Sequence, residues 1–99
     1  MEDGYPEDEE LEFIKNFDLA SNDVMELVEY VRNIWNWSDW GFKTTGKNII
    51  KLELHTGGWS GNELIIRALK ENMLFWPLYW RVHKKGGHYY FKIKKRKGK

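Results

Sequence analysis

The chain of 99 residues is 41% hydrophobic and 31% charged, a composition that predicts one soluble globular domain with a modest core. It contains no cysteine, which excludes disulfides, thiol catalysis and cysteine-based zinc sites and favours a cytoplasmic location. No apolar run approaches the roughly 20 residues of a membrane-spanning helix, and the acidic first residues lack the basic start and apolar core of a secretion signal. The unusual feature is the aromatic content of 16%, which includes six tryptophans.

The net charge of +1 conceals a strong charge asymmetry along the chain. Residues 1–12 contain seven acidic residues and no basic one, whereas residues 84–99 contain eight basic residues and no acidic one. Such an asymmetry predicts a basic segment that seeks phosphates, an acidic segment that shields it, or both. The alternative is that both ends are solvated tails that keep the protein soluble.

Two helices are predicted before residue 35. Residues 1–6 should be disordered, and residues 7–17 favour a short helix whose acidic first turn suits the helix dipole. A clearer helix follows Ser21, its expected N-cap, because apolar residues recur at i, i+3, i+4 and i+7 from Val24 to Ile34. This second helix is expected to be a core element without chemistry of its own.

Residues 35–42 hold three tryptophans, Trp35, Trp37 and Trp40, between polar residues in a pattern that fits neither a helix nor a strand. In one interpretation they close the junction between the second helix and the sheet. In the other they form an aromatic wall on which a base or a cation stacks.

A glycine-rich turn joins a strand to a helix in the second half of the chain. Residues 42–45 and 48–55 are strand candidates, and the second alternates apolar residues with Lys51, Glu53 and His55. The turn at residues 56–60 is followed by a helix over residues 61–73, for which Ser60 and Glu63 match a capping box. Its glycines either make a tight strand-to-helix turn or present backbone N–H groups to an anion.

Residues 74–95 are predicted to form a β-hairpin that turns at Gly86 and Gly87. Pro77 indicates that the first strand begins near it or lies at a sheet edge. A loop of two residues and a loop of four residues leave the same side chains on each face of the hairpin. The two faces can therefore be assigned before the register of the strands is known. One face is then the core, with Leu78, Trp80, Val82, Tyr89, Phe91 and Ile93. The other face is basic and aromatic, with Tyr79, Arg81, His83, His88, Tyr90, Lys92 and Lys94.

The exposed side of this sheet is the predicted binding surface, unless the first two helices cover it. Aromatic rings between basic side chains offer single-stranded nucleic acid or a nucleotide both stacking and countercharge. His55 ends its strand next to the glycine turn, so a phosphate on the turn would lie within reach of His55 and Arg67. Catalysis is not expected. Ser60 lacks a strained nucleophile elbow, and Glu53 is followed by Leu54 and His55 instead of the lysine typical of nucleases.

No metal or cofactor is assigned from the sequence. The three histidines could hold zinc only if the fold brings them together, which their spacing alone does not show.

Two segments stand out, Lys51-Leu-Glu-Leu-His-Thr-Gly-Gly-Trp-Ser-Gly-Asn-Glu63 and Gly86-Gly-His-Tyr-Tyr-Phe91, together with Phe75, Trp76 and Trp80. In these residues the chain resembles a group of small bacteriophage and prophage proteins of uncharacterised activity. The resemblance covers about residues 48–93. It implies no catalytic or binding residue, only a setting in which small accessory phage proteins counter host defence by binding a host protein, a nucleic acid or a nucleotide signal.

The sequence therefore predicts an α+β fold in which two N-terminal helices precede β-β-α-β-β with an antiparallel sheet. The predicted function is non-enzymatic binding of a phosphate-bearing ligand, either a nucleotide signal or single-stranded nucleic acid, in the host cytoplasm. The alternatives are an inhibitor that binds a host protein through a Trp-rich surface and, less favoured, a small nuclease or hydrolase; a homodimer is possible. The predicted ligand-binding residues are His55, Gly57, Gly58, Trp59, Ser60, Asn62, Arg67, Tyr79, Arg81, His83, His88, Tyr90 and Lys92.

Overall fold

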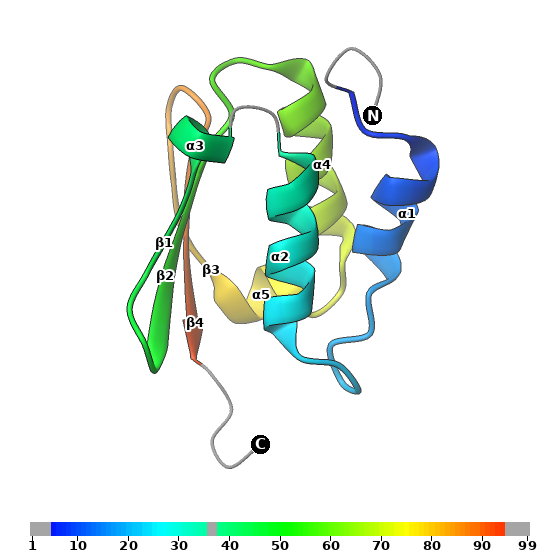
Figure 1. Cartoon of the computed structure of the whole chain (residues 1–99), viewed down its shortest axis with the longest axis vertical. Helices are drawn as coiled ribbons and strands as arrows, with labels where there is room; N and C mark the ends of the chain where they lie inside the picture. Colours follow the sequence, from blue (N-terminus) through cyan, green and yellow to red (C-terminus); the bar gives the residue numbers. More distant parts are fainter. Residues whose placement is uncertain (1–4, 36–37, 95–99) are drawn as a thin grey trace.

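The computed structural model describes residues 5–35 and 38–94 and confirms the α+β fold. Four strands form one antiparallel sheet in the order β1-β2-β4-β3, and the long helices pack on one side of it (Figure 1). The strands are β1 (Phe42–Thr45), β2 (Ile49–His55), β3 (Trp80–Lys84) and β4 (His88–Lys94). The helices are α1 (Asp8–Asn16), α2 (Val24–Ile34), α3 (Ser38–Gly41), α4 (Ser60–Glu71) and α5 (Phe75–Tyr79). No helix in the described part of the chain is long and apolar enough to cross a membrane.

Helices α1 and α2 form where the sequence predicts them, but their first residues differ. The N-cap of α2 is Asp23, whose carboxylate accepts the N–H of Met25 at 2.9 Å, so the assignment of Ser21 is wrong. An aspartate placed directly before the apolar run caps the helix as well as serine does, and adds a favourable charge at the positive end of the helix dipole. The expected disorder is wrong for Tyr5 and Pro6, since Pro6 is buried and the ring of Tyr5 lies 5.6 Å from that of Trp59. Residues 1–4 lie outside the described residues.

The tryptophan-rich segment contains the short helix α3, which lies against β1 and β2. Trp35 is 4% exposed and closes the junction between α2 and the sheet, as one of the two interpretations predicts. Trp40 is 54% exposed and lies beside His55, with ring centroids 5.9 Å apart. Trp37 lies outside the described residues.

The side of the sheet under the helices forms the core, and its residues alternate along each central strand. Ile50, Leu52 and Leu54 of β2 lie opposite Ile93, Phe91 and Tyr89 of β4, and all six are buried. Residues directly opposite each other in an antiparallel pair point to the same face, so the residues between them point to the other side. Helices α2 and α4 cover this apolar side, with α1 packed on α4 (Figure 1). Burial of these side chains is the main source of stability in such a sheet.

The glycine turn is built around the buried Thr56. Its backbone N–H donates to the carbonyl of Gly87 in the hairpin loop at 2.9 Å, and its carbonyl accepts the N–H of Trp59 at 3.0 Å. Gly57 and Gly58 adopt positive φ angles of 63° and 74°, which only glycine adopts without strain. The capping box predicted at Ser60 and Glu63 is wrong, because Trp59 is the N-cap and Ser60 is already helical. The turn thus closes through Thr56 and not through a serine cap.

The predicted hairpin differs from the structure in two ways. Residues 75–79 form the one-turn helix α5, so Leu78 and Tyr79 are not in a strand, and β3 begins only at Trp80. The loop holds three residues, Lys85–Gly87, because Lys84 pairs with His88. The prediction of a two- or four-residue loop is therefore wrong. Gly86 and Gly87 supply the positive φ angles that let an odd-numbered loop close.

The odd loop inverts the faces of β3. Val82 lies opposite Tyr90, away from the helices, whereas His83 lies opposite the buried Tyr89 on the helix side. A bulge at Arg81 then shifts the register, so that Trp80 pairs with Phe91 on the core side as predicted. The face assignment is thus wrong for Val82 and His83. Strand β3 does lie at a sheet edge, as Pro77 indicates.

Candidate functional site

The side of the sheet that faces away from the helices is basic. It is called the open face here and consists of residues from all four strands. Its charged residues are the five lysines Lys43, Lys51, Lys84, Lys92 and Lys94 and one carboxylate, Glu53; its rings are His55, His88 and Tyr90. Helices α1, α2 and α4 do not cover it, since they pack on the opposite side (Figure 1). Helix α1, which contains Asp8, Glu9, Glu10 and Glu12, lies on the opposite side of the sheet from the open face.

Tyr90 occupies the middle of the open face. It lies in β4 opposite Glu53 of β2 and Val82 of β3. The ammonium of Lys84 lies over its ring, 5.4 Å from the centroid, and the ring of His55 meets it edge-on at 5.9 Å. A half-buried aromatic ring with a cation beside it is a platform on which a base can stack next to a neutralised phosphate.

A chain of polar contacts links two histidines and a glutamate at one end of the open face. His55 and His88 are a cross-strand pair, and their Nδ1 atoms lie 2.7 Å apart. Two ring nitrogens at this distance share one proton, so one ring donates and the other accepts. The Nε2 atom of His55 lies 3.4 Å from Oε1 of Glu53, which orients the His55 ring. The pair forms a fixed polar corner next to Trp40.

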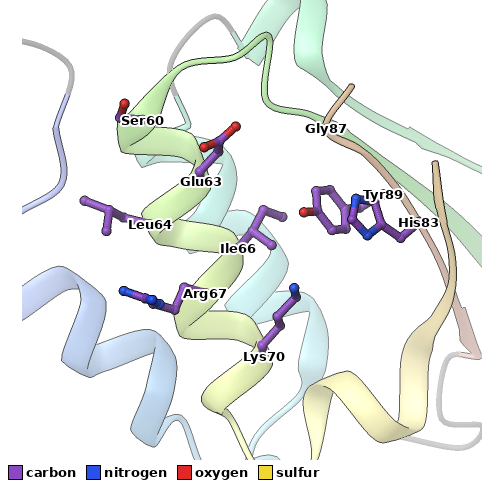
Figure 2. A pocket seen from close by; sticks show the side chains of 9 residues that line it. All are labelled: Ser60, Glu63, Leu64, Ile66, Arg67, Lys70, His83, Gly87 and Tyr89. Atoms are coloured by element: carbon purple, nitrogen blue, oxygen red, sulfur yellow. The ribbon is translucent and has the colours of Figure 1, made fainter. Parts of the chain in front are cut away.

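A second surface lies on the helix side of the same hairpin. A cavity of about 620 Å³ separates α4 from β3 and β4 (Figure 2). In Figure 2, Glu63, Ile66 and Lys70 project from α4 toward the hairpin, and Tyr89 and His83 form the opposite wall. The rings of His83 and Tyr89 stack 4.1 Å apart at an interplanar angle of 15°. The remaining lining residues are Ser60, Leu64, Arg67 and Gly87.

Within the described segments, the charged side chains of this cavity have no ion-pair partner. Neither Glu63 nor Lys70 makes an ion pair with any residue of the described segments. Lys70 lies over the rings of Trp76 and Tyr89, with its Nζ atom 5.4 Å and 5.8 Å from their centroids. Glu63 receives one long contact of 3.5 Å from the hydroxyl of Thr56. Burial raises the pKa of the Tyr89 phenol, and the charge of Glu63 raises this pKa further.

The predicted ligand-binding residues divide between several places. His55, His88, Tyr90 and Lys92 lie together on the open face, whereas Ser60, Arg67 and His83 line the cavity. Of these three, Ser60 and Arg67 point away from the hairpin in Figure 2. The two remaining groups are the turn residues Gly57, Gly58 and Trp59 with Asn62 in the first turn of α4, and the α5–β3 residues Tyr79 and Arg81.

These last two groups serve the fold. The N–H groups of Gly58 and Trp59 donate to the side chain and carbonyl of Thr56, and Asn62 is 1% exposed. Tyr79 packs on Phe75, and the guanidinium of Arg81 donates to the carbonyls of Leu78 and Trp80. Two of the backbone donors of the turn, those of Gly58 and Trp59, are thus engaged within the turn itself.

The three histidines do not converge, because His83 lies on the other side of the sheet from His55 and His88. Within residues 5–35 and 38–94, no three His, Asp or Glu side chains are grouped so that they could hold a metal ion. The sequence prediction missed several residues of the two surfaces: Lys43 and Lys84 on the open face and Glu63, Lys70 and Tyr89 in the cavity. Strand alternation could have found Lys43, but Lys84 and the cavity depend on the odd loop.

Comparisons of the chain with protein-family models, with curated proteins and with solved structures found no match.

Proposed function

We propose that the protein binds single-stranded nucleic acid on the open face of its sheet, without catalysis. The observation that carries this proposal is the grouping of five lysines and one carboxylate around Tyr90 on a sheet face that helices α1, α2 and α4 leave uncovered. In the phage setting that the resemblance implies, the ligand would be nucleic acid of the infected cell.

The charge distribution supports an extended polyanion as the ligand. Lys51 and Lys92 are directly opposite each other, and Lys94 and Lys43 extend the basic surface along β4 and onto β1. A strand of phosphates that crosses such a surface releases several counterions, which is the main source of sequence-independent affinity. The acidic residues of α1 repel the same polyanion and so favour one orientation of the protein.

The rings support single strands over duplexes. The bases of a duplex are stacked on each other, whereas an unpaired base can stack on Tyr90 or His88. Trp40, exposed beside His55, extends the aromatic surface past the end of the sheet.

Fluorescence anisotropy with a labelled oligothymidine of about 12 nucleotides tests the proposal. We expect the logarithm of the affinity to fall with the logarithm of the salt concentration with a slope of about −2 to −3, since single strands release about 0.7 ion per neutralised phosphate. Replacing Tyr90 by leucine should weaken binding by about 5- to 100-fold, while the control Tyr90→Phe keeps the ring and the affinity. Equal binding of Tyr90→Leu and wild type at every salt concentration would show that the open face is not the site.

A second candidate function is supported by one different observation. Five large apolar residues between positions 73 and 82 are exposed: Met73, Leu74, Leu78, Trp80 and Val82. Met73 and Leu74 precede α5, Leu78 lies in α5, and Trp80 and Val82 lie in the edge strand β3. Exposed apolar groups near a sheet edge can mark a protein interface. For a protein-binding module, Leu78→Asp should abolish capture of a host protein that Tyr90→Leu still captures. Sedimentation of the wild type and of Leu78→Asp shows whether these residues pair two copies.

A further inference from the structure

We propose that the cavity between α4 and the β3–β4 hairpin binds a guanine nucleotide, with Glu63 on the base and Lys70 on the phosphate. This site lies on the helix side of the sheet, so the inference goes beyond nucleic-acid binding on the open face and does not depend on it.

The size and the walls of the cavity fit one nucleotide. Its volume of about 620 Å³ lies within the range of small-ligand sites. One wall is the flat surface made by His83 stacked on Tyr89, and the other is the apolar side chain of Ile66 on α4 (Figure 2). An exposed imidazole that already stacks on a buried phenol is held in one plane, which favours stacking of a base on its free side.

Glu63 and Lys70 on α4 determine which chemical groups the two ends of the ligand must carry. Glu63 and Lys70 are seven residues apart on the same helix, so they are separated by about 10 Å along its axis. Both project toward the hairpin in Figure 2, and neither has an ion-pair partner in the described segments. A ligand that fits both has a hydrogen-bond-donating end and an anionic end. In a nucleoside monophosphate the Watson–Crick edge and the 5′-phosphate are separated by a comparable span.

The carboxylate selects among the bases. An ionised carboxylate only accepts hydrogen bonds, and it binds most strongly to two parallel donors. Guanine offers such a pair in its N1–H and its exocyclic amine, whereas adenine places an acceptor beside its amine. In Figure 2 the Glu63 side chain projects from α4 toward the hairpin, on whose aromatic wall the base would lie.

Lys70 is placed to receive the phosphate. Its ammonium lies over the rings of Trp76 and Tyr89, which hold the side chain in the cavity without neutralising it. Arg67 lines the same cavity but points away from the hairpin in Figure 2, so it adds positive potential at the rim. The phosphate would thus meet cations at one end of the cavity and the base would meet the carboxylate at the other.

Isothermal titration calorimetry of the whole chain with GMP, IMP, AMP and guanosine tests this assignment on the wild-type protein. We expect GMP to bind about 10- to 100-fold more tightly than IMP, which lacks the exocyclic amine, and than AMP. Guanosine, which lacks the phosphate, should also bind more weakly than GMP. Equal affinity for AMP and GMP would overturn the guanine assignment, and no heat with any of them at millimolar concentration would overturn the nucleotide site.

Two variants locate the contacts. Glu63→Met should abolish the difference between GMP and IMP, and Lys70→Met should abolish the difference between GMP and guanosine, while each leaves the other difference intact. Glu71→Met is the matched control, because Glu71 lies on the same helix but does not line this cavity. If either difference persists in its variant, that contact is wrong. Neither variant should alter binding of oligothymidine, which contains no guanine, so failure of this site and failure of the open face are distinguishable.

Discussion

The open face and the cavity are two sides of the same pair of strands, and they differ in how charge is arranged. On the open face His88, Tyr90 and Lys92 alternate with the buried residues of β4, and lysines surround them without walls. In the cavity Tyr89 and His83 face a helix that presents the acid Glu63 and the base Lys70, with Arg67 at the rim. A surface of one charge sign without walls binds phosphates with little selectivity, whereas a walled site with both signs can select the base.

Loss of the hairpin loop should destroy both surfaces, and this is the largest effect we expect. A Cβ atom at Gly87 would collide with the hydroxyl of Thr56, and the residue has a φ of +81°. We expect Gly87→Ala to lower the free energy of unfolding by about 3 kcal/mol, measured by urea denaturation. Gly58→Ala is the matched control. Its φ is +74° but a Cβ there meets nothing within 4 Å, so it should cost about 1 kcal/mol. Equal losses would mean that the contact with Thr56 does not hold the loop.

The lysines of the open face should affect only the polyanion. Combined replacement of Lys51, Lys92 and Lys94 by glutamine should make the salt slope of oligothymidine binding less steep by about 2 and leave GMP binding unchanged. Anisotropy across a salt series measures the slope. Lys15→Gln, on α1, is the control for a change of net charge. A slope that stays constant in the triple variant would place the phosphates elsewhere.

Adjacent residues of β3 should separate the two surfaces. His83→Ala should weaken GMP binding by about three- to tenfold without changing oligothymidine binding, because its ring lies on the helix side. Lys84→Ala should do the reverse, since its ammonium lies over Tyr90. If both variants affect the same ligand, β3 does not have the register that the three-residue loop imposes.

The smallest effect concerns stability at alkaline pH. The pKa of Tyr89 lies above its ordinary value of 10.0, chiefly through burial and then through Glu63, and that of Tyr30 is raised by burial and by Glu10 and Glu9. A phenol with a raised pKa binds its proton longer in the folded state than in the unfolded state. Its contribution to stability is therefore complete below pH 10 and is lost as the pH rises through the folded-state value.

Urea denaturation at several pH values from about 9 to 11 measures this loss. We expect Tyr89→Phe to reduce the decline in the free energy of unfolding, and Tyr90→Phe is the control of the same substitution on the open face. A decline that is identical in wild type and Tyr89→Phe would contradict the assignment to Tyr89.

Periodicity was sufficient for the elements in which one repeat continues without interruption. The apolar spacing of α2 and the alternation of Ile50, Leu52 and Leu54 predicted both elements and their buried faces. The caps were less predictable, because Ser21 and Asp23 are both good N-caps near the same helix start. The prediction of a cap at Ser60 was wrong for a related reason. The turn is closed by Thr56, whose N–H donates to the carbonyl of Gly87 in the hairpin loop, and this contact is visible only in the tertiary structure.

The sequence by itself determined that this chain is an α+β protein, and it placed His55, His88, Tyr90 and Lys92 on one side of the sheet, because residues of one strand alternate strictly between two faces. Only the tertiary structure decided what His83 faces. One extra loop residue and the bulge at Arg81 reverse the faces within β3, and two-, three- and four-residue hairpin loops are all compatible with a Gly-Gly turn. The residues of the open face could thus be predicted from the sequence. The cavity could not, because it forms only when the hairpin packs against α4.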